Sequence, residues 1–270
     1  MSIQTRSLPI LDHIVILVTH STLESLPTKL NDSFAVAPGG PHADGLTANK
    51  LILFADGTYI ELIAFVDGVD PDRRAQHRWG ELPEAAIIDW AYTLRHEVDF
   101  AAVQQRVAQS QSGLVYSDPI PGGRTKPDGT MLKWAVAAAR GPDGSPTRPG
   151  SVPFWCLDRT PRNLRVPYEQ EHQLTQHPCG ALGVSSLGVS VPVHEVSDLG
   201  KVYDAIHDSS SEGGAWQFQV LSRSGTGRHV VSITGAEEAR RIELVLHGDS
   251  ATSVKLVPGV VLRVEARRPC

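Results

Sequence analysis

Long apolar runs alternate along the chain with segments in which apolar residues recur at helical spacing. The run LDHIVILVT, residues 11–19, is rich in β-branched side chains and predicts a strand. The next segment predicts a short helix, because three leucines recur there at helical spacing: Leu23, Leu26 and Leu30. Three further apolar runs follow, and Asp56-Gly57 between the last two is a hairpin signal. Residues 11–66 are therefore predicted to have the order β-α-β-β-β.

The same order recurs in the rest of the chain, and such repeats indicate stacked structural modules. Residues 85–158 show a strand, an amphipathic helix and three more strands, and residues 181–266 show a looser third copy. The intervening segment 159–180 is polar and rich in proline, so we expect a linker there that wraps the surface. The prediction is an α+β protein built from paired βαβββ modules, 11–66 and 85–158, followed by the linker and a third module.

A carboxylate, Glu61, interrupts the apolar run GTYIELIAF that ends the first module. Alternation along a strand places it on one face with Tyr59, Ile63 and Phe65. Because burial of an unpaired charge is costly, Glu61 faces solvent, is paired, or binds something. The run RRIELVLH carries Glu243 at what we interpret as the same place in the third module. This recurrence favours a functional role for Glu61 over a merely solvent-exposed position.

Charge and composition exclude several classes of function. The net charge is −5 and no dense block of Lys and Arg occurs, which argues against a nucleic-acid partner. No apolar run reaches the roughly 18 residues needed to cross a bilayer, and the N-terminal segment lacks the layout of a signal peptide. Three widely spaced cysteines, Cys156, Cys179 and Cys270, form neither a zinc pattern nor a disulfide framework. We expect a cytoplasmic protein without membrane contact.

Three motifs together carry a resemblance to a known family: LDHIVILV, PGGPHADGLTANKLILFADGTYIELIAF and GGRTKPDGTMLKW. They resemble the glyoxalase-like domain proteins of the vicinal oxygen chelate (glyoxalase/bleomycin resistance/dioxygenase) superfamily. The resemblance implies that paired modules form open, cup-shaped mixed β-sheets with helices packed outside. It also implies a divalent metal inside the cup, held by the first and fourth strands of each module, which acts as a Lewis acid on a substrate oxyanion.

By this resemblance, His13 matches the first-strand metal ligand and Glu61 matches the fourth-strand ligand. An imidazole with a carboxylate suits Zn, Fe, Mn or Ni. The other modules depart from the pattern at the corresponding places: Trp90 and Ser186 for the imidazole, Leu157 or Asp158 for the carboxylate. The ligand set is therefore incomplete. Either the metal has been lost or a less regular residue completes the site: His42, His172, His177 or Glu243.

Further residues are candidates for substrate contact. His42 is interpreted as a catalytic acid or base and Asn49 as a hydrogen-bond donor, both in a glycine-rich loop. Arg124 has the geometry to clamp a carboxylate or phosphate, and Trp134 supplies a flat apolar wall. His177 is a candidate catalytic residue that reaches the cavity. Each of these residues also has a structural interpretation. His42 and Asn49 could lie in an exposed loop, and Arg124 and Trp134 could be an ordinary hairpin charge and a core side chain. His177 could be an exposed histidine of the linker.

The predicted function is a glyoxalase-like lyase or isomerase that stabilises an oxyanion of a small-molecule metabolite, with or without a divalent metal. Two alternatives stay open: a metal-free isomerase or cyclase of a larger apolar metabolite, and a non-catalytic binding protein of the resistance type. No nucleotide cofactor is indicated, because the glycine-rich loops lack the Gly-Lys-Ser/Thr of a phosphate loop. A homodimer is compatible with these expectations.

Overall fold

A computed structural model of the chain describes residues 8–126, 128–222, 228–237 and 240–267, so that Cys270 lies outside the described residues. The first module has the predicted order: β1 (Ile10–Leu17), α1 (His20–Lys29), β2 (Ala37–Pro41), β3 (Thr47–Leu53) and β4 (Tyr59–Phe65). Thr19 caps helix α1, because its side chain accepts a hydrogen bond from the amide of Thr22. Such a cap satisfies one of the free amides of the first turn.

The second module follows after a short helix and adds two small strands to the predicted pattern. Its elements are α2 (Pro71–Gln76), β5 (Ala86–Thr93), the 3₁₀ helix η1 (Glu97–Asp99), α3 (Phe100–Gln109), β6 (Val115–Tyr116), β7 (Ile120–Thr125), β8 (Met131–Ala137), β9 (Ala139–Arg140) and β10 (Phe154–Asp158). Strands β6 and β9 form a separate two-stranded sheet.

The two modules share one eight-stranded sheet in the order β2-β3-β4-β1-β5-β10-β8-β7. Strands β1 and β5 run antiparallel at its centre. Each is flanked by a parallel strand of its own module, β4 beside β1 and β10 beside β5. The modules are thus related by an approximate two-fold axis between β1 and β5, which gives residues of β1 and β4 counterparts in β5 and β10.

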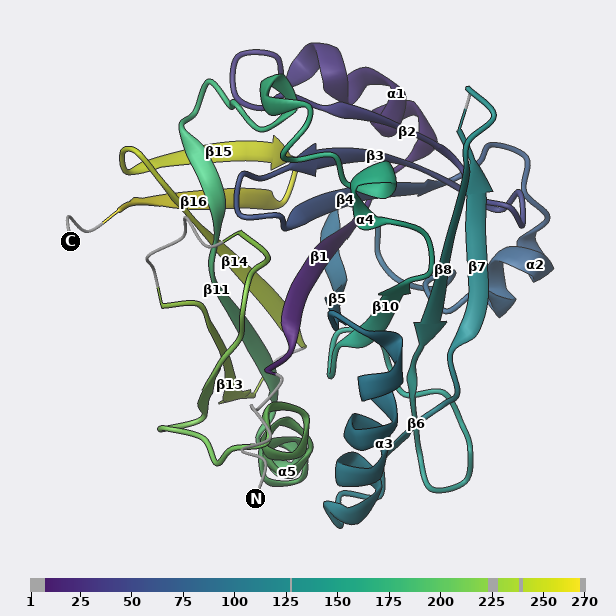
Figure 1. The fold of residues 1–270 in the computed structure, drawn as a ribbon, viewed down its shortest axis with the longest axis vertical. Coiled ribbons are helices and arrows are strands. Elements are labelled where there is room, and N and C mark those ends of the chain that lie inside the picture. Colours follow the sequence, from purple (N-terminus) through teal and green to yellow (C-terminus); the bar gives the residue numbers. More distant parts are fainter. Residues whose placement is uncertain (1–7, 127, 223–227, 238–239, 268–270) are drawn as a thin grey trace.

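The sheet curls into a nearly closed cup with helices outside it, as expected (Figure 1). Its convex face carries Trp90, Tyr92 and Trp155 into a core shared with α1 and α3. Its concave face carries a second apolar cluster that includes Ala91 and Phe154. The two edge strands of the sheet approach each other, because a methyl group on Gly40 of β2 would lie 3.2 Å from the Arg124 Nη1 atom of β7.

The segment 159–180 does more than wrap the surface. It forms helix α4 (Arg162–Arg165) and the 3₁₀ helix η2 (His172–Leu174), and it buries Arg165 and Val166 against the end of the cup. The polar composition that suggested an exposed linker reflects arginines that are paired with buried carboxylates. His172 is exposed, as the linker prediction expected.

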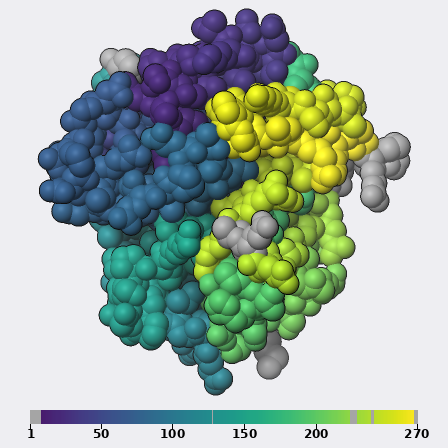
Figure 2. All heavy atoms as spheres, turned by 180° about the vertical axis from the view of Figure 1, so that it is seen from behind, coloured from purple at the N-terminus to yellow at the C-terminus, as the bar shows by residue number. Residues whose placement is uncertain are grey.

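The C-terminal region forms a second sheet. Its elements are β11 (Ala181–Pro192), η3 (Val193–Glu195), α5 (Val196–His207), β12 (Ala215–Gln217), β13 (Val230–Ala236), β14 (Arg241–Gly248), β15 (Thr252–Val257) and β16 (Val260–Ala266). The six strands lie in the order β12-β13-β11-β14-β16-β15. One face of this sheet shares the large core of the first sheet, and α5 packs beside α3. Figure 2 shows the C-terminal strands against the first module.

The topology corrects the equivalence expected between Glu61 and Glu243. Strand β14, which carries Glu243, is antiparallel to β11, whereas β4 is parallel to β1. The strand parallel to β11 is β13, so β14 takes the place of β5 rather than that of β4. Glu243 is exposed and lies 3.4 Å from the Arg241 guanidinium. The shared letters IEL around Glu61 and Glu243 therefore do not mark equivalent positions in the two modules.

Candidate active site

A cavity of about 310 Å³ lies inside the cup formed by the two modules. Its polar lining includes the residues predicted as metal ligands and most of those predicted to contact substrate: His13, His42, Asn49, Glu61 and Arg124. Its walls are mainly aromatic and aliphatic: Leu51, Tyr59, Trp79, Trp134, Val136 and Phe154. A concave, largely apolar pocket with a few convergent polar groups is the usual form of a small-molecule site.

His13 is held from behind by Asp12. The pairing of β1 with β5 skips one residue between Leu11 and His13, which makes Asp12 the extra residue of a β-bulge. A bulge re-aims side chains, and the Asp12 Oδ2 atom here lies 3.2 Å from the His13 Nδ1 atom. The His13 ring also stacks on Tyr59, with ring centroids 4.7 Å apart.

Asp12 is buried, and both of its carboxylate oxygens form ion pairs with arginine side chains. Arg162 Nη1 lies 2.5 Å from its Oδ1 atom, and Arg165 Nη2 lies 3.2 Å from Oδ2. Burial alone would raise the pKa of Asp12, but the two guanidinium groups outweigh burial and hold that pKa well below its ordinary value. Asp12 is therefore ionised and can only accept hydrogen bonds, so the His13 Nδ1 atom carries a proton and Nε2 has a free lone pair.

Glu61 is buried and receives one strong hydrogen bond. The Asn49 side-chain amide donates to the Glu61 Oε1 atom over 2.7 Å. The orientation of this amide is fixed by Gly40, whose backbone N–H donates to the Asn49 Oδ1 atom over 3.2 Å. Glu61 is therefore shielded from solvent and forms no ion pair with any Lys or Arg that the structure describes, and its Oε2 atom points toward His13 at 3.6 Å from Nε2.

His42 approaches Glu61 from the other side. Its Nε2 atom lies 3.7 Å from Glu61 Oε1 and 3.4 Å from the Asn49 amide nitrogen. Because that amide is a donor, His42 Nε2 accepts, and His42 Nδ1–H donates to the Thr47 hydroxyl over 2.7 Å. Two imidazoles thus turn unprotonated nitrogens toward one carboxylate. The Asn49 amide is a shared donor between His42 Nε2 and Glu61 Oε1, whereas no donor of the described chain lies between His13 Nε2 and Glu61 Oε2, where a cation would relieve the repulsion of the facing lone pairs.

Arg124 supplies a positive charge to the same cavity. It donates no hydrogen bond to, and forms no ion pair with, any residue that the structure describes. Burial lowers its pKa, and the facing Tyr59 and Glu61 oppose that shift. A half-buried guanidinium without a partner is available for an anionic group of a ligand. Trp134, on the neighbouring strand β8, lies edge-on to His42 with ring centroids 6.3 Å apart.

His177 is placed elsewhere. Its Nε2 atom donates to the Leu53 carbonyl over 2.9 Å, and its Nδ1 atom accepts from the Ala35 amide over 3.1 Å. The ring is packed between Phe34 and Phe54, and burial lowers its pKa to about 4. Both nitrogens are engaged and His177 is not among the cavity-lining residues. The geometry gives it a structural place beneath the first module.

The register of the second module corrects the expected counterparts of the two ligands. In the first module His13 pairs with Tyr59 on β4, and Glu61 follows Tyr59 by two residues. In the second module Ala91 pairs with Phe154 on β10, and Cys156 follows Phe154 by two residues. Ala91 is thus the counterpart of His13, and Cys156 is the counterpart of Glu61. Trp90 faces the opposite core instead, and Leu157 does the same. Asp158 binds Arg162 and Arg165.

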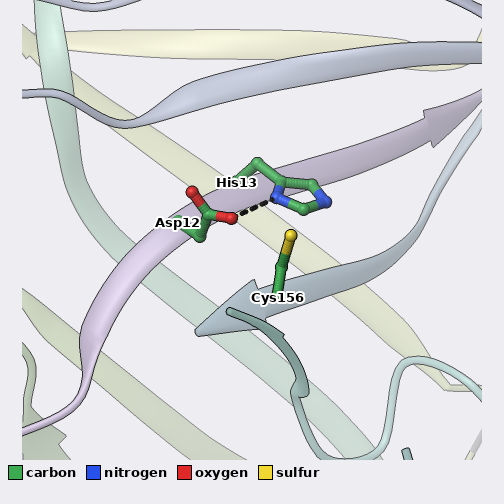
Figure 3. Close-up of side chains that lie close together, drawn as sticks. All are labelled: Asp12, His13 and Cys156. Carbon is green, nitrogen blue, oxygen red and sulfur yellow. Dashed lines mark hydrogen bonds and ion pairs between the residues drawn. The ribbon is translucent and has the colours of Figure 1, made fainter. Parts of the chain in front are cut away.

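Cys156 and Arg165 are cavity residues that the sequence patterns did not single out. One oxygen of Asp12, one ring nitrogen of His13 and the sulfur of Cys156 lie within 4.8 Å of one another (Figure 3). Burial raises the pKa of the Cys156 thiol well above its ordinary value, although Arg165 opposes this effect. Arg165 donates to the Tyr59 hydroxyl over 2.6 Å. Only the strand register and the fold of 159–180 bring these two residues to the cup.

The donors fit the divalent metal implied by the resemblance. His13 Nε2 and Glu61 Oε2 are both free of hydrogen bonds to the described residues, and a separation of 3.6 Å is too long for a hydrogen bond between them. It is close to the distance between two ligands of one ion with bonds near 2.1 Å. Asp12 and Asn49 hydrogen-bond to these two donor groups from behind, as the outer partners of ligands do in metal sites.

Comparisons with known proteins agree with this architecture. A protein of Staphylococcus aureus, described as hypothetical, superposes with a TM-score of 0.63 at 16% identity, covering 96% of this chain and 100% of that one. The Mn(II)-bound glyoxalase of Novosphingobium aromaticivorans superposes with a TM-score of 0.50 at 11% identity, covering 96% and 82%. At these identities the likeness concerns the fold alone. No curated protein sequence gives a significant match.

The fold and the cavity define a protein of the vicinal oxygen chelate class. The family model described as glyoxalase-like domain matches residues 11–201, which include both modules of the cup. The chain belongs to this glyoxalase-like family. Among the described helices, none is long and apolar enough to cross a membrane.

Proposed function

We propose that the cavity is the active site of an isomerase or lyase that removes a proton next to a carbonyl group of a small carboxylate. The observation that carries the proposal is the convergence of His13 Nε2, His42 Nε2 and the Glu61 carboxylate within one cavity. Such a site favours the binding of a cation next to a substrate oxygen. It also holds an imidazole base within reach of the same substrate.

His42 is the proposed proton carrier. Its Nε2 lone pair, which accepts only the long 3.4 Å contact from the Asn49 amide, lies at the cavity wall, and the hydrogen bond from Nδ1–H to Thr47 stabilises the imidazolium that forms when a substrate proton replaces that contact. The substrate C–H bond breaks, its electron pair moves to the carbonyl oxygen, and the proton moves to His42. Return of that proton to the opposite face of the same carbon gives epimerisation, and departure of a leaving group with its electron pair from the next carbon, as a carbon–carbon double bond forms, gives elimination.

His13 and Glu61 are the proposed protein ligands of a divalent ion. The ion, when bound, supplies a Lewis acid for the substrate oxygen that gains charge. Asn49 keeps Glu61 turned with one oxygen toward His13, and Asp12 keeps the His13 lone pair directed into the cavity. These positions are fixed before substrate arrives, which lowers the cost of reorganisation during the reaction.

Arg124 and the cavity walls indicate the kind of substrate. The guanidinium has no protein partner among the described residues, so we assign it to a carboxylate of the substrate. Trp79, Trp134 and Phe154 surround the remaining space and favour a flat or apolar body. A cavity of about 310 Å³ suits a small metabolite better than a peptide or a polymer.

Hydrogen exchange with solvent tests this proposal without knowledge of the product. The purified protein, loaded with Zn²⁺, Co²⁺ or Mn²⁺, is incubated in D₂O with a panel of 2-oxo and 3-oxo carboxylates. Proton NMR then follows the loss of the C–H signal next to the carbonyl. We expect catalysed exchange for a subset with aromatic or branched bodies, and its loss in His42→Gln with retained thermal stabilisation by the same compounds.

Two outcomes would contradict the proposal in different ways. Binding of carboxylates without exchange, for any of the metals, would identify a non-catalytic binding protein. Exchange that persists after removal of metal by a chelator, and in Glu61→Gln, would identify a metal-free enzyme. His96→Gln is a suitable control for histidine replacement, because His96 is exposed and lies outside the cavity lining.

A further inference from the structure

Three buried tyrosines donate their hydroxyl hydrogens to acceptors of the protein. For Tyr92 the direction follows from its partner: His207 donates from Nδ1 to the Tyr203 carbonyl over 2.8 Å, so its Nε2 atom accepts. Such partners are usual, because a buried O–H without an acceptor is costly. The acceptors are His207 Nε2 for Tyr92, the Pro153 carbonyl for Tyr116 and the Ser151 carbonyl for Tyr203, at 3.2, 2.8 and 3.0 Å respectively.

Tyr59 is also buried, but it lacks such an acceptor. Its hydroxyl oxygen accepts a hydrogen bond from the Arg165 Nη1 atom over 2.6 Å. Its hydroxyl hydrogen finds no acceptor within the described part of the chain. Tyr59 is only 4% exposed and lines the cavity, whereas the other three buried tyrosines do not line it. The acceptor that this O–H needs therefore comes from the contents of the cavity.

Arg165 keeps this hydrogen free for a ligand. Because a guanidinium only donates, the Tyr59 hydroxyl cannot give its hydrogen to Arg165. The guanidinium is itself held in place by Asp12 and Asp158, at 3.2 and 2.7 Å. The Tyr59 ring is fixed as well, since the His13 ring stacks on it with centroids 4.7 Å apart. The hydroxyl is thus an immobilised donor, and the hydrogen bond that it accepts from a charged group strengthens the one that it donates.

Arg124 is a second donor on the wall of the same cavity. The cavity thus presents two donors that no described residue accepts from, one of them charged and the other neutral. Carboxylates and carbonyl groups only accept hydrogen bonds. An acid that also carries a carbonyl oxygen therefore has acceptors for both Arg124 and Tyr59.

We propose that the Tyr59 hydroxyl donates a hydrogen bond to an oxygen atom of the bound acid and so selects ligands that carry an acceptor at that point. This inference rests on the substrate class of the proposed function, but on neither its metal nor its proton transfer. A site with a buried donor discriminates against a ligand that leaves the donor unpaired. Arg124 recognises the charge of the acid, and Tyr59 recognises the position of one of its oxygens.

Paired ligands test this assignment by affinity rather than by activity. Calorimetry at equal, measured zinc content compares 2-oxo acids that have phenyl, indolyl or branched bodies with the same acids without the oxo group. We expect Tyr59→Phe to bind the 2-oxo acids roughly 5–10-fold more weakly than the wild type, which corresponds to one hydrogen bond. Tyr116→Phe is the matched control, because it removes the same atom from a buried ring outside the cavity lining. It should bind every acid as the wild type does.

Carbon NMR on the unmodified chain provides an independent measurement, because Tyr59→Phe also removes the acceptor of Arg165 and can impair folding. The five tyrosines are labelled with ¹³C at the ζ carbon, and spectra are recorded in an equal mixture of H₂O and D₂O. A hydroxyl that exchanges slowly with solvent gives two ζ-carbon signals, one for each hydrogen isotope. We expect one tyrosine signal that is single in the free protein to split when a 2-oxo acid binds.

The outcomes separate this inference from the proposed function. A loss of affinity confined to the 2-oxo acids supports a bond to the oxo oxygen, and a loss shared by both acids of each pair supports a bond to the carboxylate. Equal affinity of Tyr59→Phe and wild type for every acid would overturn the inference, and so would a loss without splitting of a tyrosine signal. Catalysed hydrogen exchange in that variant would then leave the proposed function standing. Failure of every acid to bind the wild type would overturn both.

Discussion

The Asn49 amide donates to the Glu61 Oε1 atom over 2.7 Å, and this contact leaves the Oε2 atom turned toward His13. The two residues lie on neighbouring strands, where Asn49 pairs with Ile63 in the antiparallel register of β3 and β4. A buried carboxylate is thereby satisfied on one oxygen and available on the other. The position of the free Oε2 atom therefore depends on the Asn49 side chain.

Asn49→Ala should weaken metal binding without removing it. Loss of the amide frees Glu61 to rotate and removes an outer partner, so the affinity for Zn²⁺ should fall about 10–100-fold. Competition titration with a chromogenic chelator measures this change. Lys50→Ala is the matched control, because the neighbouring Lys50 side chain contacts Glu24 instead of the cavity. Equal affinity of Asn49→Ala and wild type would refute the positioning role of Asn49.

Arg124→Gln should weaken the binding of carboxylates selectively. A hydrogen bond to a charged group contributes about 1.5–3 kcal/mol, so the dissociation constant should rise roughly 10–150-fold. The corresponding carboxamides should bind equally well to the variant and the wild type. Calorimetry with acid and amide pairs of the same body separates these effects. Arg124→Lys, which keeps the charge but loses the bidentate geometry, should lie between the two. A similar loss for acids and amides would contradict the assignment.

Asp12→Asn should destabilise the protein strongly. The substitution removes the charge that compensates the buried Arg165 and its neighbour Arg162, and removal of one partner of a buried ion pair costs about 3–5 kcal/mol. Urea denaturation followed by circular dichroism provides the free energy of unfolding. Glu97→Gln breaks the more exposed pair with Arg159 and should leave the urea midpoint nearly unchanged. A small effect of Asp12→Asn would show that Asp158 alone compensates both arginines.

Gly183→Ala should disturb the contact between the two sheets. A methyl group on Gly183 of β11 would lie 2.0 Å from the Asp56 Oδ2 atom and 2.6 Å from His247 Nε2. Overpacking of this kind costs about 1–3 kcal/mol, and here it also displaces Asp56 from the Val184 amide. Gly188→Ala on the same strand should be tolerated, because the nearest atom would be 3.7 Å away. Thermal melting of both variants checks the difference.

Stability should fall in mild acid because of His177. Its pKa is about 4 in the folded protein and 6.5 for an ordinary histidine, so the unfolded chain binds the additional proton between these values. The contribution of His177 is therefore complete above pH 6.5 and is lost as the pH falls toward 4. By linkage it amounts to roughly 3 kcal/mol. Urea unfolding across this range should show a shallower pH dependence in His177→Gln than in His96→Gln, and parallel curves would contradict the assignment.

Local patterns predicted the first module well. Alternation along residues 59–65 identified a strand with Glu61 on one face, and the cost of burying a lone carboxylate indicated that it needs a partner. His42 and Asn49 were proposed as site residues because glycine-rich loops approach ligands closely, and Arg124 was proposed because a guanidinium can clamp an anion; all three line the cavity, and their contact with a substrate stays a prediction. The same local approach did not place His177 correctly. The sequence around a histidine that precedes a strand does not distinguish a side chain that reaches a cavity from one that donates to a backbone carbonyl, as His177 does to Leu53.

The equivalences between modules could not be obtained from the sequence. Trp90 seemed to match His13, yet the register makes Ala91 its counterpart. A shift of one residue moves a side chain to the other face of a sheet, and no local pattern sets the pairing of strands that lie far apart in the chain. For the same reason, the resemblance between the runs around Glu61 and Glu243 gave no information about whether each strand runs parallel to its neighbour.

The sequence by itself determined the strand and helix order of the first module, its apolar faces, and the presence of a carboxylate, Glu61, that needs a partner when it is buried. Those properties depend on spacing along a few neighbouring residues. Tertiary structure decided that Cys156 takes the second carboxylate position, that a bulge turns Asp12 behind His13, and that Arg165 arrives from the segment 159–180. These features depend on strand register and on ion pairs between residues far apart in the sequence, and both are set by the free energy of the whole folded chain.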